Sequence, residues 1–382
     1  MKVIILQRVI PSYRVAVFRE ICFNKNHDIS LLIGDDLKES KGKNARDLSG
    51  IRHKKVRSKA VSILGRVFTR HIGLFSELRS SKPDVIVCEA ESHFLGYLTA
   101  IIYSLFFSRK TKLILWCFYS LPGIDQERTK FHAMVKTISR NCFDGFISYT
   151  SFGKKYLLSK GISENKITVA TNVCDTQLFI DKNRSLDITK EQAKKILGVE
   201  GKFVASYIGT VNEVKRPDVI LDLAKRFDGK DFHFFLVGAG PLEGVLKKHV
   251  SDQKLTNINV TGRITDDLAL YYRATDVVLI PGRGGIVISE AMCFGVPVIL
   301  HQADGIEYDL VINGFSGSRL VSGSVESFEG ELDALYKEPD CLGEMGKNAR
   351  ELIIDSFNTS TMAAAVISAI DSATRIDKTN SI

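Results

Sequence analysis

The residues best suited to chemistry lie between positions 281 and 299, in the sequence PGRGGIVISEAMCFGVPVI. Paired glycines follow an apolar strand-like run here, and Glu290 comes four residues after Ile286, on the same face of the expected helix. Glycines at a helix start let backbone N–H groups approach a phosphate, and the helix dipole favours that anion. Glu290 could accept two hydroxyl hydrogen bonds, as from a ribose. The segment therefore indicates a site for a nucleotide-activated group, while a buried strand–helix unit with a tight turn is the plainer interpretation.

Three further motifs follow strand-like runs in the same half of the chain. The stretch GTVNEVKRPD begins at Gly209, and its Lys215 and Arg216 could neutralise a diphosphate. The tetrapeptide GAGP at 238–241 is only half of a dinucleotide fingerprint, so a close strand-to-helix turn is the better interpretation of it alone. The tripeptide TGR at 261–263 follows another strand end, where backbone groups could contact a base.

Both halves of the chain alternate strand-like runs with helix-length amphipathic segments, which predicts parallel sheets covered on both faces. The expected strands are residues 2–6, 29–33, 84–87, 113–116, 145–148, 168–170, 203–208, 232–237, 257–260 and 277–280. The expected helices are residues 15–23, 131–140, 153–160, 217–226, 242–250, 266–272 and 344–373. Such sheets bind ligands at the carboxyl ends of their strands, which is where the motifs above lie.

A chain of 382 residues favours two domains rather than one hydrophobic core. We predict an α/β protein with two doubly wound Rossmann-like domains that face a central cleft. The predicted parts are a first domain at 1–180, a linker at 181–200, a second domain at 201–360, and a C-terminal helix and tail at 361–382 that packs back on the first domain. The linker rests on a polar stretch rich in Lys and Asp.

Composition excludes several classes of protein. The seven cysteines are scattered without a CxxC pair and the eight histidines have no ligand spacing, which favours reduced thiols over disulfides or a zinc site. The longest apolar run, residues 94–107, is shorter than the roughly 18 to 20 residues that cross a bilayer and predicts a buried helix. The N-terminal residues lead into a strand pattern without signal-peptide organisation, so we expect a cytoplasmic protein.

Charge is distributed unevenly along the chain, whose formal net charge is +8. Residues 1–175 carry 29 Lys and Arg against 15 Asp and Glu, about +14, which leaves 23 against 29, about −6, for the remainder. The excess gathers between Lys38 and Arg70, interleaved with apolar residues. A basic amphipathic segment suits peripheral attachment to an anionic membrane, here the inner face of the plasma membrane. A solvated charged face is the alternative, and no recognition motif supports a nucleic-acid partner.

The second half resembles the nucleotide-sugar-binding domain of retaining GT-B glycosyltransferases, specifically glycosyltransferase family 4. The matching stations, in order, are Gly209…Lys215, Val237-Gly-Ala-Gly-Pro241, Val260-Thr-Gly262, Tyr272…Ala274-Asp276, Pro281 to Glu290-Ala-Met and Gly295-Val-Pro-Val. The first half is similar more loosely: residues 7–14 resemble the acceptor-side loop of members that build bacterial surface polysaccharides, and residues 172–175 resemble the segment that closes the first domain.

The resemblance implies a retaining, metal-independent glycosyltransferase that moves a sugar from a nucleoside diphosphate to a lipid-linked or polysaccharide acceptor in cell-surface glycan biosynthesis. UDP is expected rather than GDP, with no cofactor beyond the donor. The implied catalytic residues are Lys215, Arg216 and Glu290. The implied donor-binding residues are Gly209, Thr210, Gly240, Arg263, Gly284, Gly285, Ile286 and Val287. The acceptor-side candidates are Tyr13, Arg14 and His93.

The chain departs from the family pattern at three positions. Gly282 stands where the family has a carboxylate, Thr210 where it has an arginine, and Phe118 in the region where it often has a histidine. A non-catalytic accessory subunit with this fold therefore stays as an alternative. A sugar-nucleotide epimerase would need acids and bases that the first half does not clearly provide. A dinucleotide oxidoreductase is disfavoured because the sequence has no complete GxGxxG fingerprint followed by an acidic residue.

Overall fold

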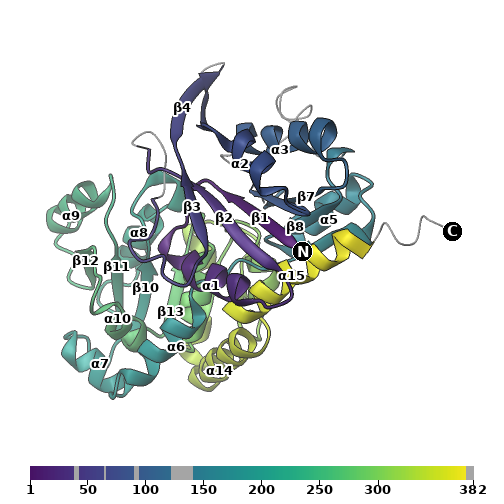
Figure 1. Cartoon of the computed structure of the whole chain (residues 1–382). Coiled ribbons are helices and arrows are strands. Elements are labelled where there is room, and N and C mark those ends of the chain that lie inside the picture. Colours follow the sequence, from purple (N-terminus) through teal and green to yellow (C-terminus); the bar gives the residue numbers. More distant parts are fainter. Residues whose placement is uncertain (38–42, 64–65, 90–93, 122–140, 376–382) are drawn as a thin grey trace. The chain divides into compact units, whose positions relative to one another are not determined.

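The computed structural model describes residues 1–37, 43–63, 66–89, 94–121 and 141–375. The chain divides into two compact units, one of Met1–Thr171 with Thr359–Ile382 and one of Asn172–Asn358. Each unit is a parallel sheet with helices on both faces (Figure 1). The α/β class and the two Rossmann-like sheets predicted from the sequence are thereby confirmed, while the predicted helix at 131–140 lies outside the described residues.

Unit 1 contains a seven-stranded sheet in the order β3-β2-β1-β6-β7-β8-β9. Its strands are β1 (Lys2–Gln7), β2 (Asp28–Gly34), β3 (His53–Val56), β6 (Val85–Glu89), β7 (Lys112–Cys117), β8 (Gly145–Ser148) and β9 (Ile167–Val169). All neighbouring pairs are parallel. The central strands are continuous apolar runs because a parallel sheet is buried on both faces.

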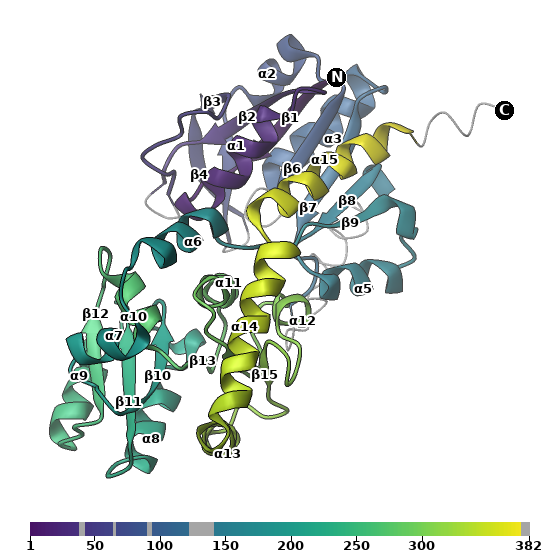
Figure 2. The same cartoon turned by 90° about the horizontal axis from the view of Figure 1, so that it is seen from below.

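Helices cover both faces of the unit 1 sheet. Helices α2 (Leu74–Ser81), α3 (Phe94–Phe107) and α5 (Ser151–Ser159) pack on one face, and α1 (Val15–Phe23) and α15 (Thr359–Arg375) pack on the other. On the face covered by α1 and α15, the ring of Phe18 packs edge to face against Trp116 of β7, and Val366 and Ile370 of α15 are fully buried. The helix at the C-terminal end of the described chain therefore completes the core of unit 1 (Figure 2).

The described part of the basic segment between Lys38 and Arg70 contains three strands that were not expected from the sequence. Strand β3 joins the sheet beside β2, and β4 (Ser58–Ile63) pairs antiparallel with β5 (Arg66–His71). Two short helical turns complete the unit, η1 (Ser12–Arg14) and η2 (Glu164–Lys166). Residues 38–42 and 64–65 of the basic segment lie outside the described residues.

Unit 2 contains a six-stranded parallel sheet in the order β12-β11-β10-β13-β14-β15. Its strands are β10 (Phe203–Ile208), β11 (Phe232–Val237), β12 (Ile258–Gly262), β13 (Val277–Ile280), β14 (Val298–Leu300) and β15 (Gly317–Arg319). From β10 the chain builds outward to β12 and then returns to place β13 on the other side of β10. The strand order thus reverses between β10 and β13, and such a switch point is where open α/β sheets bind ligands.

Helices also cover both faces of the unit 2 sheet. Helices α8 (Asp218–Arg226), α9 (Glu243–Asp252) and α13 (Val325–Lys337) enclose a core in which Phe227, Phe234 and Phe328 are fully buried. The remaining helices are α6 (Thr176–Ser185), α7 (Lys190–Ile196), η3 (Glu213–Lys215), α10 (Leu268–Ala274), α11 (Ile286–Cys293), α12 (Glu307–Leu310) and α14 (Pro339–Asp355).

The predicted linker at 181–200 is wrong, because this segment is part of unit 2. It contains the end of α6 and all of α7, and Thr189 with Gln192 forms a capping box at the start of α7. The Asn183 side chain donates to the carbonyl of Cys293, and Lys194 pairs with Asp276 at 2.6 Å. The polar composition therefore reflects helix surfaces and ion pairs rather than a solvated connection.

The predicted single helix at 344–373 is instead two helices with a break at 356–358. The first, α14, belongs to unit 2, whereas α15 belongs to unit 1. Within the described residues no single helix has the length and apolarity to cross a membrane; the bent pair α14 and α15 together meets such a test only by length and composition.

Candidate functional site

The loops that leave β10 and β13 bring the predicted phosphate-binding residues together. Gly209 leaves β10 with a φ of 148°, and the chain then reaches Lys215 at the end of η3. A Cβ atom placed on Gly209 would lie 3.6 Å from the Lys215 ammonium nitrogen, and one placed on Gly284 would lie 3.0 Å from it. The ammonium therefore lies between the two glycine turns at the switch point of the sheet.

Local hydrogen bonds fix the path of the β10 loop. Asn212 caps η3, because its Oδ1 accepts from the Lys215 N–H at 3.2 Å. The Tyr207 hydroxyl donates to the carbonyl of Thr210 at 2.6 Å, and Val211 is fully buried. The Val211 N–H donates to the carbonyl of Ala239 in the neighbouring turn. The exposed Thr210 thus contributes its backbone to the shape of the loop.

The GAGP turn at 238–241 is a close approach between two backbones. A Cβ atom on Gly238 would lie 2.8 Å from the carbonyl carbon of Gly209, and one on Gly240 would lie 2.7 Å from the carbonyl carbon of Val211. Glycine is required at both positions because any side chain would displace the β10 loop. Gly240 therefore supports the loop that carries Lys215.

The Lys215 ammonium is partly removed from solvent. Burial lowers the pKa of Lys215, while the nearby carboxylates of Asp304 and Glu290 oppose that shift. An ammonium that is held near carboxylates in a partly buried site gains favourable interactions when an anionic group arrives. A diphosphate at the two glycine turns would supply that charge.

Helix α11 begins beside this ammonium, and its N-terminus has no side-chain cap hydrogen bond among the described residues. Its first residues are Ile286 and Val287, after Gly285 at the cap position. Ser289 holds the helix in place, because its hydroxyl donates to the carbonyl of Ile286 and accepts from the Cys174 N–H at 2.9 Å. Unsatisfied N–H groups and the helix dipole make such an N-terminus favourable for an anion.

Glu290 lies one turn into α11 and is held by a buried tyrosine. The Tyr272 hydroxyl donates to Glu290 Oε2 at 2.7 Å, and the Tyr272 ring stacks on Phe294 with centroids 4.9 Å apart. Burial raises the pKa of Glu290, and Tyr272 and Lys215 oppose that shift. One hydrogen bond leaves a carboxylate with further acceptor capacity, enough for ribose hydroxyls. Tyr272 belongs to the motifs that resemble the family, but the resemblance implies no role for it.

Gly282 occupies a position without room for a side chain. A Cβ atom there would lie 2.6 Å from the carbonyl carbon of Lys215 and 2.7 Å from its Cα, and it would clash with the carbonyl oxygen of Val214. The Arg283 N–H donates to that same oxygen at 3.2 Å. The two loops are thus in backbone contact, which gives the departure from the family pattern at Gly282 a steric cause.

Asp304 is a carboxylate at this site that the sequence analysis missed. It follows β14, and a Cβ atom on Gly285 would lie 2.6 Å from its Cγ. Burial and the neighbouring Glu307 raise the pKa of Asp304 to about 6. The local sequence offers one signal, an Asp–Gly pair four residues after the end of β14, and many ordinary turns share that signal.

Two predicted cationic residues differ from Lys215 in their surroundings: Arg216 has partners of its own, and Arg263 follows an edge strand. Arg216 has a φ of 49°, and its guanidinium donates to the carbonyl of Gly323 at 2.8 Å and lies 3.8 Å from Asp218. Arg263 is exposed and directly follows β12, the edge strand on the far side of β11 from β10. The structure therefore gathers Gly209, Lys215, Gly284 and Glu290 but not these two side chains.

The acceptor-side candidates belong to unit 1, where η1 follows the carboxyl end of β1. Tyr13 is half-buried, and Arg14 is buried with its guanidinium carbon 4.4 Å from the ring centroid of Tyr149. Burial raises the pKa of Glu89, and Arg14 opposes that shift. Arg14 thus supports the sheet edge by stacking and charge. His93 lies outside the described residues.

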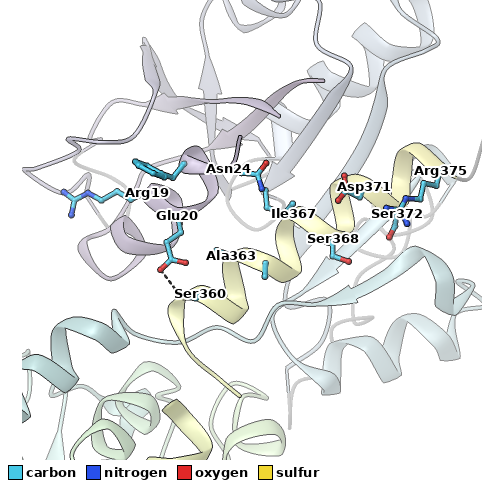
Figure 3. A pocket seen from close by; sticks show the side chains of 12 residues that line it. Arg19, Glu20, Asn24, Ser360, Ala363, Ile367, Ser368, Asp371, Ser372 and Arg375 are labelled. Carbon is cyan, nitrogen blue, oxygen red and sulfur yellow. Dashed lines mark hydrogen bonds between the residues drawn. The ribbon is translucent and has the colours of Figure 1, made fainter. Parts of the chain in front are cut away.

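A separate groove of about 690 Å³ lies in unit 1 between α1 and α15 (Figure 3). The Ser360 hydroxyl donates to Glu20 at 3.0 Å across it, and the ring of Phe23 at its edge is 79% exposed. None of the residues predicted to bind donor or acceptor lines it. In the described part of the chain no group of three or more His, Cys, Asp or Glu side chains could hold a metal ion, and all seven cysteines are free thiols.

Parts of the chain are similar in sequence to known proteins. Residues 189–352 match the family described as Glycosyl transferases group 1. The D-inositol 3-phosphate glycosyltransferase of Rhodococcus erythropolis is 27% identical over 175 residues, which are 42% of this chain and 39% of that protein. A protein of Klebsiella pneumoniae described as an uncharacterized 41.2 kDa protein in the cps region is 24% identical over 254 residues, 64% of this chain and 67% of that one. The match to the first relative thus spans about two fifths of its length.

The fold of the whole chain is similar to that of solved structures. The crystal structure of Anabaena HepE in complex with UDP has a TM-score of 0.73 at 16% sequence identity, and the match covers 97% of this chain and 100% of that one. At 16% sequence identity, this similarity shows the fold alone. The chain therefore has the GT-B fold, and its residues 189–352 are similar to the Glycosyl transferases group 1 family.

Proposed function

We propose that the protein is a retaining, metal-independent glycosyltransferase. It transfers a sugar from a UDP-sugar to a lipid-linked or polysaccharide acceptor in cell-surface glycan biosynthesis. The observation that carries this proposal is the Lys215 ammonium between the turns at Gly209 and Gly284, in the same unit as the anchored Glu290. The UDP in the Anabaena structure supports uracil as the base of the donor.

The residues of unit 2 would act mainly through positioning and charge. Lys215 and the N-terminus of α11 would stabilise negative charge that grows on the leaving diphosphate, and Glu290 would hold the ribose. In a retaining reaction of this kind the leaving diphosphate assists the attack of the acceptor hydroxyl. The acceptor would meet the loop that contains Tyr13, with Arg14 fixing that loop from beneath.

The experiment that tests the donor site is titration calorimetry with UDP and with GDP. We expect micromolar binding of UDP that is lost in Glu290→Gln, a variant that keeps the size of the side chain. Glu351→Gln is the matched control, because that glutamate is 58% exposed on α14 and lies 3.9 Å from Lys347. A folded protein that binds neither nucleotide would exclude this function and favour the accessory subunit.

The accessory-subunit alternative is favoured by one observation, the backbone contact that excludes a side chain at position 282. Turnover separates the two functions. The enzyme would release UDP from a UDP-sugar when acceptor is added and slowly by hydrolysis without it, whereas an accessory subunit would release none at any protein concentration. An epimerase would convert one UDP-sugar to its epimer without an acceptor.

Peripheral attachment to an anionic membrane is the second part of the proposal, and α3 supports it. The C-terminal turns of α3 expose four apolar side chains, Ile102 at 42%, Leu105 at 52%, Phe106 at 75% and Phe107 at 54%. Arg109 and Lys110 follow at once and are exposed. The strand β5 packs against α3, and its hairpin adds the exposed Lys59 and Arg70. Apolar side chains ringed by cations suit the boundary of an anionic bilayer.

Sedimentation with vesicles tests this attachment. We expect binding to vesicles that contain phosphatidylglycerol at low salt, weaker binding at high salt, and weaker binding by Phe106→Ser. The control is Phe23→Ser, which removes an equally exposed ring from α1. Binding that is absent at low salt, or lost equally in both variants, would contradict the assignment of this surface.

A further inference from the structure

The loop between β14 and α12 is built to present Asp304 at the start of α11. Glu307 is 1% exposed, and its two carboxylate oxygens accept from the N–H groups of Ala303 at 3.1 Å and Gly305 at 2.8 Å. These two N–H groups flank Asp304 on either side. Gly305 also turns the chain with a φ of 99°. A buried carboxylate is thus used to fix the backbone on both sides of a second carboxylate.

The Asp304 side chain lies against the N-terminal turn of α11. A Cβ atom on Gly285 would clash with both oxygens of this carboxylate and lie 2.6 Å from its Cγ. The backbone N–H groups of Ile306 and of Asp304 itself bond to this carboxyl, but among the described residues its Oδ1 is buried without a hydrogen-bond partner. A buried acceptor without a donor is destabilising, so its presence beside a candidate site calls for a ligand that supplies the donor.

The charges around Asp304 decide which part of a UDP-sugar would supply that donor. Lys215 is the nearby cation, and Glu307 and Glu290 are the other charged groups that interact with this pair. A diphosphate is an acceptor and an anion, so an ionised carboxylate repels it while the Lys215 ammonium attracts it. A sugar hydroxyl is neutral and can donate. The diphosphate therefore belongs with Lys215, and a hydroxyl of the attached sugar belongs with Asp304.

The loop after β13 cannot supply a carboxylate from position 282. Position 282 has no room for any side chain, because the backbone of Val214 and Lys215 fills the space. Asp304 approaches the neighbouring Gly285 from the loop after β14, the next strand of the sheet.

We propose that Asp304 binds a hydroxyl of the donor's transferred sugar and so selects that sugar. Glu307 acts as the positioning residue that fixes the Asp304 loop. This inference rests on the proposed function, because it requires a UDP-sugar at the glycine turns.

Calorimetry with UDP, UDP-glucose, UDP-galactose and UDP-N-acetylglucosamine tests the assignment in the wild type and in Asp304→Asn. We expect the ratio of Kd for the preferred UDP-sugar to Kd for UDP to rise about tenfold or more in the variant, the usual effect of losing a hydrogen bond to a charged group. UDP itself should bind the variant at least as tightly as the wild type, which also shows that the variant is folded. Asp222→Asn, on the exposed face of α8, is the charge-matched control.

Deoxyfluoro analogues of the preferred UDP-sugar identify the hydroxyl. The effect of Asp304→Asn should vanish for the one analogue that lacks the recognised hydroxyl and persist for the others. If Kd changes by the same factor for UDP and for the UDP-sugar, the ratio stays unchanged, and Asp304 acts only as a charge near Lys215. That result would overturn the inference while leaving the proposed function intact. Absence of UDP binding by the wild type would overturn both.

Discussion

Lys215 is the side chain on which the proposed chemistry of unit 2 depends most, because its ammonium lies between both glycine turns. We expect Lys215→Met to lower kcat/KM for the UDP-sugar by about 10²- to 10³-fold, the usual effect of removing one preorganised electrostatic group. Steady-state release of UDP measures it. Lys225→Met is the control, since that lysine lies on the exposed face of α8 and pairs with Asp222 at 3.0 Å. Unchanged turnover in Lys215→Met would contradict the role.

Asp304 makes stability depend on pH in a defined direction. Its pKa is raised from 3.8 to about 6 in the folded protein, so folding favours the protonated carboxyl and stability falls as pH rises through that range. We expect Asp304→Asn to raise the free energy of unfolding by on the order of 2 kcal/mol at pH 7.5, with the gain fading toward pH 4. Urea denaturation at both pH values measures it. A variant that is less stable at pH 7.5, or whose gain is the same at pH 4, would contradict this.

At the scale of elements, the β10 and β13 loops fit each other through backbone contact at Gly282. We expect Gly282→Ala to separate the loops, lower stability by about 1 to 3 kcal/mol and weaken UDP binding, because the new methyl group meets the backbone of Lys215. Thermal unfolding and calorimetry measure the two effects. Gly244→Ala in α9 is the control, since nothing lies within 4 Å of a Cβ atom there. Equal behaviour of the two variants would show that the loops are not in contact.

The place of each site residue relative to the strands explains which of them could be predicted from the sequence. Short motifs that follow apolar strands contain four of them: Gly209, Lys215, Gly284 and Glu290. One continuous stretch of sequence therefore shows both the motif and its position at the end of a strand. Asp304 carries no such motif. Its importance comes from the Glu307 carboxylate that fixes its loop and from the neighbouring Gly285 turn.

At the scale of the whole molecule, α15 ties the C-terminal part of the described chain into unit 1. Ile370 is fully buried there, so we expect Ile370→Ala to cost about 2 to 5 kcal/mol and to lower the unfolding temperature of unit 1. UDP binding in unit 2 should be retained under conditions where unit 1 stays folded. Ile367→Ala on the same helix is the control, because that side chain is only half-buried beside the open groove. Similar losses in both variants would contradict this packing.

The sequence by itself determined the class of fold, because apolar runs of strand length that alternate with amphipathic segments leave a parallel sheet with two covered faces as the favourable solution. It also located the glycine turns and Lys215, whose chemistry is local. It misassigned residues 181–200, because the polar outer faces of α6 and α7 have the composition of a linker.

Tertiary structure alone decided which loops meet. The order β12-β11-β10-β13-β14-β15 places the loops after β10, β13 and β14 at one edge of the sheet, although long stretches of chain separate them. That order excludes a side chain from Gly282, sets Asp304 against Gly285 and anchors Glu290 through Tyr272. It likewise assigned α15 to unit 1, because the buried face of a helix shows that it needs a partner but not which partner it will meet.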